Sequence, residues 1–149
     1  MATLALNEGL CFLRLCFTFS SYFLFILGAE PAFNYLSKFR GPPQYFLQEK
    51  EETIGMGALV ELKEGTGEIK RMYVKPEYRG KGLGREMLRL LLAKAKEYGL
   101  SEIYLETGAF MTTAQGLYRS MGFHDRSEYP ETEVPPQLRR FWIFMEKQI

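Results

Sequence analysis

The stretch from Glu68 to Gly84, EIKRMYVKPEYRGKGLG, constrains the fold most, because a strand pattern runs straight into a glycine-rich turn. Side chains alternate along a strand, which predicts Glu68, Lys70, Met72 and Val74 on one face and Ile69, Arg71, Tyr73 and Lys75 on the other. Pro76 has no N–H to donate and ends the strand. A helical pattern from Arg85 to Tyr98 follows, with an apolar stripe of Met87, Leu91, Ala95 and Tyr98 that should face the core. Gly99 is its expected C-cap glycine. The stretch therefore predicts a strand–turn–helix unit.

The turn has the composition of an anion-binding site. It contains the glycines Gly80, Gly82 and Gly84 and the cations Arg79, Lys81 and Arg85. Glycines let a ligand approach the backbone closely, and the N–H groups at the start of a helix have no intrahelical partner. A cation such as Arg85 in the first turn opposes the helix dipole unless an anion is bound nearby. The turn therefore predicts a phosphate or pyrophosphate site.

Two common nucleotide motifs fit this turn badly. The Walker pattern ends in Gly-Lys-Ser/Thr, and Lys81 is followed by glycine. The dinucleotide fingerprint GxGxxG fails because Gly80, Gly82 and Gly84 are evenly spaced. The pattern that fits is Gln/Arg-x-x-Gly-x-Gly, with Arg79, Gly82 and Gly84 in its fixed places.

Length, charge and cysteine content limit the class of protein. A chain of 149 residues predicts one domain, spanning 1–149, with a core of its own. The net charge of +1 gives no bulk attraction to nucleic acid, so no nucleic-acid partner is expected. Cys11 and Cys16 form neither a metal-ligand spacing nor a disulfide framework. We expect buried thiols in a reducing, cytoplasmic setting and no metal.

The N-terminal segment leaves several interpretations open. Most positions from Leu10 to Leu27 are apolar, close to the length of a membrane helix, but Arg14 interrupts the run. No basic residue precedes the run, and Glu8 stands where a signal peptide carries positive charge. A buried helix, or a strand followed by one, is the favoured interpretation. A membrane anchor and a wrongly assigned gene start are the alternatives.

The rest of the chain predicts an antiparallel meander followed by a parallel crossover and a closing strand. Strands are predicted over Gln44–Glu49, Thr53–Leu62, Glu102–Thr107 and Arg140–Lys147, with Phe123 opening another; helices are predicted over Glu30–Phe39 and from a Thr112 or Thr113 cap to Met121. Gly55 and Gly57 inside the second strand indicate a bulge or a close backbone approach. The three prolines between Tyr129 and Gln137 predict a loop. In the closing strand, Phe141, Ile143 and Met145 should alternate in direction with Trp142, Phe144 and Glu146.

A second motif, AQGLYRSMGF from Ala114 to Phe123, follows the turn one helix and one strand later. Together the two motifs resemble those of the GNAT superfamily of N-acetyltransferases. The resemblance covers about residues 44–147 and leaves residues 1–40 atypical. It implies an α/β (α+β) fold with a mixed central sheet, an antiparallel meander, a parallel βαβ crossover and helices on both faces.

The resemblance also implies how acetyl-CoA would bind. Two central parallel strands splay apart in the family, and the co-substrate lies in the gap. Backbone groups of Met72, Tyr73 and Val74 would pair with the pantetheine arm as an added strand does. The pyrophosphate would lie on the N–H groups of Arg79, Gly80, Lys81, Gly82, Leu83, Gly84 and Arg85.

The resemblance suggests two catalytic residues. Tyr118 is the candidate general acid for the leaving thiolate, against the alternative that it only packs. Glu68, eleven residues before Arg79, is the candidate base, against an ion pair with Lys70; Glu106 acting through water is the other candidate. His124 is expected to be structural or at the surface. Met111 stands where many members have an asparagine near the pantetheine.

The expected function is transfer of an acetyl group from acetyl-CoA to a primary amine of a small molecule, by direct attack in a ternary complex. The alternatives are acetylation of a protein lysine or N-terminus, and a non-catalytic acyl-CoA-binding module. The expected partners are acetyl-CoA and an amine acceptor. A homodimer is left open, as is a membrane contact through Leu10 to Leu27.

Overall fold

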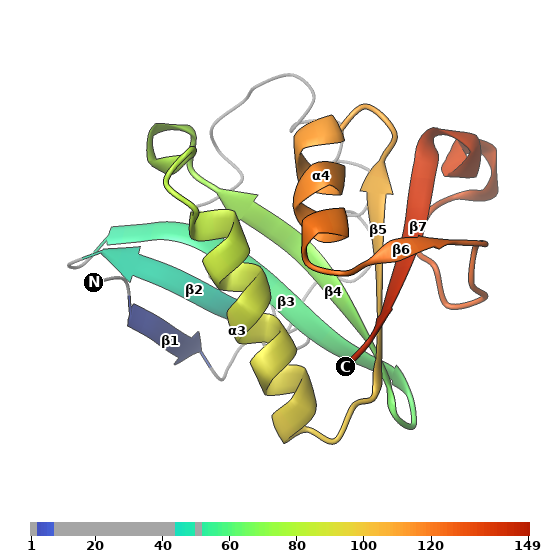
Figure 1. The fold of residues 1–149 in the computed structure, drawn as a ribbon, viewed down its shortest axis with the longest axis horizontal. Coiled ribbons are helices and arrows are strands. Elements are labelled where there is room, and N and C mark those ends of the chain that lie inside the picture. The colour runs from blue at the N-terminus through green and yellow to red at the C-terminus, as the bar shows by residue number, and fades with distance from the viewer. Residues whose placement is uncertain (1–2, 8–43, 50–51) are drawn as a thin grey trace.

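A seven-stranded mixed sheet forms the centre of the molecule (Figure 1). The computed structural model describes residues 3–7, 44–49 and 52–149. The strands, in the spatial order β1-β2-β3-β4-β5-β7-β6, are β1 (Thr3–Asn7), β2 (Gln44–Glu49), β3 (Glu52–Lys63), β4 (Thr66–Val74), β5 (Glu102–Gly108), β6 (His124–Arg126) and β7 (Trp142–Gln148). The helical elements are η2 (Pro76–Tyr78), α3 (Leu83–Glu97), α4 (Thr112–Ser120) and η3 (Pro136–Phe141).

The strand pairing confirms the predicted topology. Strands β2, β3 and β4 form an antiparallel meander, and β4 and β5 are parallel with α3 between them in the chain. Strand β7 inserts between β5 and β6 and is antiparallel to both. This is the mixed α/β sheet expected from the two motifs.

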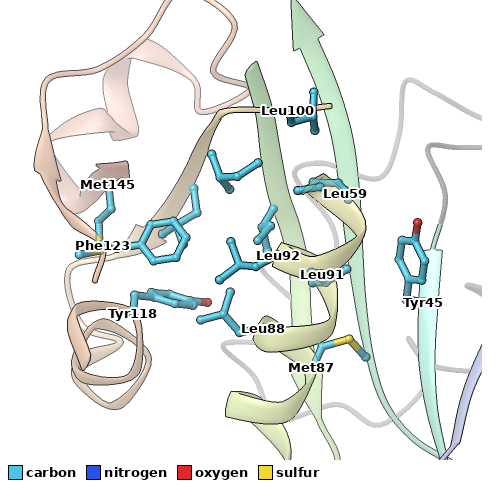
Figure 2. Close-up of a cluster of buried hydrophobic side chains, with 14 of the residues drawn as sticks. Tyr45, Leu59, Met87, Leu88, Leu91, Leu92, Leu100, Tyr118, Phe123 and Met145 are labelled. Atoms are coloured by element: carbon cyan, nitrogen blue, oxygen red, sulfur yellow. The ribbon is translucent and has the colours of Figure 1, made fainter. Parts of the chain in front are cut away.

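Helices α3 and α4 lie on the same face of the sheet and share one core with it (Figures 1 and 2). The apolar stripe predicted on α3 is buried there, with Met87, Leu88 and Leu91 at 0% exposure. Helix α3 begins at Leu83, two residues before the predicted start, because Gly82 adopts a left-handed conformation and serves as its N-cap. Gly99, also left-handed, follows its C-cap as predicted.

The opposite face carries a smaller cluster built on Tyr104, Tyr129, Val134 and Phe144. The proline-rich loop that supplies Tyr129 and Val134 ends in η3, so β7 begins at Trp142, and the predicted start at Arg140 is wrong. The alternation predicted in the closing strand is confirmed, since Met145 packs in the first core and Phe144 in the second. The predicted helix over Glu30–Phe39 and the run from Leu10 to Leu27 lie outside the described residues.

Strand β4 contains a bulge that the sequence pattern did not predict. Met56 pairs with Tyr73 and Ala58 with Lys70, so Arg71 and Met72 together lie opposite one residue of β3. Arg71 has a φ of 55°, in the left-handed region that a residue with a side chain seldom occupies. The extra residue turns Met72 to the α3 side together with Ile69. The uniform alternation predicted for this strand is therefore wrong beyond Lys70.

The parallel ladder between β4 and β5 is short and then opens. It runs from Thr66–Glu102 to Ile69–Leu105, whereas β4 continues to Val74 and β5 to Gly108. Figure 1 shows the two strands meeting at one end and diverging toward the other. The splay that the family resemblance implied is confirmed, and we refer to the region where Lys70–Val74 and Glu106–Gly108 no longer pair with each other as the opening.

No helix within the described part of the chain combines the length and hydrophobicity needed to span a bilayer.

Candidate active site

The glycine-rich turn joins the open end of β4 to α3. After η2, Gly80 and Gly82 have φ values of 74° and 80°, and nothing lies within 4 Å of the place where either would carry a Cβ. Both positions have space for a side chain, so packing does not require glycine there. The left-handed backbone does, because residues with a Cβ seldom adopt it. Helix α3 begins directly after Gly82, so its first N–H groups have no intrahelical partner. The turn fits the anion site predicted from the sequence.

The three cations of the turn contact protein groups. Arg79 donates from Nε to the Val74 carbonyl at 2.9 Å, and its guanidinium lies 5.5 Å from the centre of the Tyr73 ring. The Lys81 ammonium lies 5.0 Å from the Tyr78 ring centre. Because these side chains brace the turn, the backbone N–H groups are the main donors that the turn offers to the predicted anion.

Arg85 fastens the start of α3 to the end of α4. It donates to Ser120 Oγ at 2.9 Å and to Met121 Sδ at 3.2 Å. Gly84 allows close packing at the same place, since a Cβ there would lie 3.3 Å from Leu117 Cδ2. The two sequence motifs therefore meet in space and hold the two helices beside the opening.

Beyond the ladder with β5, one edge of β4 borders the opening instead of β5, while the other edge still pairs with β3. Met72, Tyr73 and Val74, the residues predicted to pair with pantetheine, all lie beyond the last β4–β5 pair. The Val74 carbonyl already accepts one hydrogen bond from Arg79, which leaves one lone pair for a ligand. The edge could accept an extended chain as an added strand.

Tyr118 lies on the α3 side of the sheet. Its ring packs edge-on against Phe123 with centroids 6.1 Å apart, and only 8% of the residue is exposed (Figure 2). Burial raises the pKa of the phenol to about 12, so it remains protonated at neutral pH. Among the described residues, none forms a hydrogen bond with its hydroxyl.

Glu68 lies on the other face of the sheet and is fully buried. Its Oε1 accepts a 2.6 Å hydrogen bond from the Tyr129 hydroxyl, and its Oε2 forms a 3.0 Å ion pair with Lys70. Burial raises its pKa, whereas Lys70 and the Tyr129 bond act in the opposite direction. The ion pair considered for Glu68 exists, and it does not exclude a role as base.

Glu106 is the first residue of β5 past the ladder, on the same face as Glu68. It accepts a hydrogen bond from Thr132 Oγ1, and burial raises its pKa. The positive charge of Lys70 acts against this rise in the pKa of Glu106. The Lys70 ammonium also lies 3.1 Å from Glu133 Oε2. Three carboxylates and one ammonium give this side of the opening net negative charge.

Two buried polar residues escaped prediction. Gln115 donates from Nε2 to the carbonyls of Gly108 and Ala109, at 3.0 Å each, and so fastens α4 to the end of β5. Tyr129, in the loop between β6 and η3, is the direct partner of Glu68. Gln115 belongs to the second motif, so its position in the sequence could have indicated a role. Tyr129 lies in a proline-rich stretch that carries no such indication.

The remaining candidates have structural positions. His124 is exposed at the edge of the sheet, with Nε2 3.1 Å from Glu146 Oε1, as expected for a surface residue. Met111 is the N-cap residue of α4, so the predicted cap at Thr112 or Thr113 is wrong; both are already helical. The Met111 sulfur accepts from the Thr107 hydroxyl, a sulfur–oxygen separation of 3.8 Å.

Known proteins share this arrangement. The chain is 38% identical over 97 residues to the IAA acetyltransferase of Azospirillum brasilense, an alignment that spans 64% of this chain and 61% of that protein. An acyl-CoA N-acyltransferase structure from Klebsiella pneumoniae superposes with a TM-score of 0.71 at 27% identity. The superposition spans 99% of this chain and 97% of that one. The acetyltransferase YncA of Salmonella typhimurium, solved with its cofactor acetyl-CoA, gives a TM-score of 0.59 at 25% identity, covering 72% of this chain and 65% of that one.

The family model described as the acetyltransferase (GNAT) family matches residues 13–123, which include the glycine-rich turn and the second motif. With the splayed sheet and the helix that starts at that turn, this match is decisive: the chain belongs to the acetyltransferase (GNAT) family.

Proposed function

We propose that the chain is an acetyl-CoA-dependent N-acetyltransferase that acylates a primary amine of a small molecule. The observation that carries the proposal is the opening between β4 and β5. At its mouth lies a glycine-rich turn with free helix N–H groups, and at its closed end lie two buried carboxylates. A related structure that contains acetyl-CoA supports the choice of co-substrate.

The residues of the chain fit this co-substrate. The N–H groups from Arg79 to Arg85 would hold the pyrophosphate, and the backbone of Met72, Tyr73 and Val74 would pair with the pantetheine arm. Acetyl-CoA supplies a thioester carbonyl that the amine nitrogen attacks, and coenzyme A leaves as the thiol.

The amine must lose a proton before or during attack, and Glu68 in its ionised form would accept it. Backbone N–H groups of the bulge at Arg71 and Met72 would polarise the acyl oxygen. Tyr118, held as the neutral phenol, would donate a hydrogen bond, and in the acid role its proton, to the departing sulfur. The net negative charge around Glu68 suits an acceptor that arrives as an ammonium ion.

Calorimetric titration of acetyl-CoA into the full-length protein tests the first step. Saturable binding is expected, and the double variant Gly82→Asp, Gly84→Asp should abolish it by placing carboxylates where the phosphates bind. The control is Gly116→Asp, which adds one carboxylate, half the charge of the double variant, on the exposed side of α4, where nothing lies within 4 Å. Folded wild-type protein that binds no acetyl-CoA would contradict the proposal.

Thiol release measured with a panel of small amines and of lysine or N-terminal peptides then identifies the acceptor. Turnover with small amines supports the proposal as stated. Turnover with peptides alone assigns a protein acetyltransferase instead, and binding without turnover on any amine assigns a non-catalytic module.

A further inference from the structure

One short segment of the loop between β6 and η3 contacts three charged side chains of β4 and β5, namely Glu68, Lys70 and Glu106. The Tyr129 hydroxyl donates to Glu68 Oε1 at 2.6 Å, and the Thr132 hydroxyl donates to Glu106 Oε2. Glu133, the next residue, forms a 3.1 Å ion pair with Lys70. Three of the five residues from 129 to 133 are thus partners of charged groups that lie on β4 and β5.

Tyr129 is held in place independently of its hydrogen bond. It is 1% exposed, and its ring lies 5.0 Å from that of Tyr104 and 5.6 Å from that of Phe144. Its carbonyl accepts from the Thr132 N–H at 3.1 Å, which closes a tight turn. A packed ring and a fixed backbone leave its hydroxyl little freedom, so the oxygen that meets Glu68 is preorganised.

The groups that face Glu68 come from four elements of the fold. They are Lys70 of β4, Glu106 of β5, Tyr129 and Glu133 of the loop, and Arg126 of β6 through Tyr129. Of these, only the Tyr129 hydroxyl donates a hydrogen bond in a direction fixed by packing, because Lys70 divides its ammonium between Glu68 and Glu133.

We propose that Tyr129 is the positioning residue of Glu68: its hydroxyl stabilises the ionised carboxylate and fixes its orientation beside the opening. This rests on the proposed function, in which Glu68 must be ionised to accept the proton of the amine. A carboxylate accepts a hydrogen bond more strongly than a carboxylic acid does, so a phenol that donates to Glu68 favours its ionised form. Tyr129 thereby extends the reaction to lower pH than burial of Glu68 alone would allow.

The pH profile of kcat/KM in Tyr129→Phe tests the proposal. Loss of a hydrogen bond to a charged group should raise the pKa of Glu68 and move the acid limb up by about one pH unit. The matched control is Tyr104→Phe, which removes a hydroxyl from the neighbouring ring, where it bonds Glu102 at 2.7 Å and not Glu68. An acid limb that stays in place in an active Tyr129→Phe enzyme overturns the proposal, as does an equal shift in the control.

Two measurements keep the test decisive. If Tyr129→Phe fails to fold, 3-fluorotyrosine at position 129, a stronger donor of nearly the same shape, should move the limb to lower pH, and no movement overturns the proposal. If the wild-type protein acetylates no amine, the proposed function fails, and ¹³C NMR titration of the Glu68 carboxyl still decides the contact. If the Glu68 carboxyl then titrates at the same pH in the wild type and in Tyr129→Phe, the positioning role is overturned.

Discussion

Glu68 and Tyr118 lie on opposite faces of the central sheet. Glu68 accepts its hydrogen bond from Tyr129 in the cluster on one face, and Tyr118 packs in the core beneath α3 on the other. The sheet separates them except where β4 and β5 diverge beyond Ile69 and Leu105. In the proposed reaction the acyl carbon would therefore lie in the opening, with the amine on the Glu68 side and the sulfur on the Tyr118 side.

Tyr118→Phe should lower kcat at least about tenfold and leave acetyl-CoA affinity nearly unchanged, because a general acid acts in the transition state. Its hydroxyl has no partner among the described residues, so the free energy of unfolding should change by less than about 0.5 kcal/mol. Steady-state kinetics and calorimetry measure both. Tyr45→Phe, which removes a hydroxyl bonded to Tyr98, is the control and should keep full activity. Equal loss of turnover and affinity would exclude the acid role.

Glu68→Gln should reduce kcat by about 10²-fold or more, since it removes the base but keeps an oxygen for the Tyr129 hydroxyl. The acid limb of the pH profile should disappear with the titrating group. A profile identical in shape to that of the wild type would remove Glu68 as the base and favour Glu106.

Gly82→Ala should lower the free energy of unfolding by about 1–2 kcal/mol, because the left-handed backbone at a φ of 80° is unfavourable for alanine. Gly116→Ala is the matched control, since both sites have nothing within 4 Å and Gly116 lies within α4. Alanine at position 116 should raise the free energy of unfolding by about 0.5–1 kcal/mol. Thermal unfolding of the two variants should give Tm changes of opposite sign; the same sign would contradict the assigned geometry.

Glu106→Gln should become more stable relative to the wild type as the pH rises. Burial raises the pKa of Glu106 in the folded state, so protonation contributes stability below the unfolded pKa. That contribution is lost as the pH rises through the folded pKa, whereas glutamine stays neutral and still accepts from Thr132. Unfolding by denaturant at pH 4 and at pH 7 measures the difference, and a pH-independent difference would rule out the buried acid.

Gln115→Leu should lower the free energy of unfolding by about 1–3 kcal/mol, because it leaves the carbonyls of Gly108 and Ala109 without their donor. It should also reduce turnover, since Tyr118 lies one turn further along the same helix. Gln148→Leu is the control, as it removes an exposed amide bond to Glu102 and should cost less than about 0.5 kcal/mol. Similar losses in the two variants would contradict the role of Gln115.

The glycine-rich turn, the meander and the stripe on α3 could be predicted because each depends on residues close together in the chain. Gly80, Gly82 and Gly99 do have the backbone that only glycine adopts readily, and Gly55 does mark a close backbone approach, with a Cβ there 3.1 Å from the Tyr73 carbonyl oxygen. Local signals of this kind act through φ, alternation and helical periodicity, which a single sequence displays.

The residues around Glu68 could not be predicted in this way. The pattern placed Glu68 in β4 but gave no sign that Tyr129, 61 residues later, would bond it, and the proline-rich stretch indicated only a loop. The bulge at Arg71 was equally hidden, because the mismatch with β3 exists only once the two strands pair. The sequence alone thus determined the family signature and the order of the strands. Tertiary structure decided the burial, partners and ionisation of the carboxylates, because desolvation and charge depend on groups that are distant in the chain and meet only in the fold.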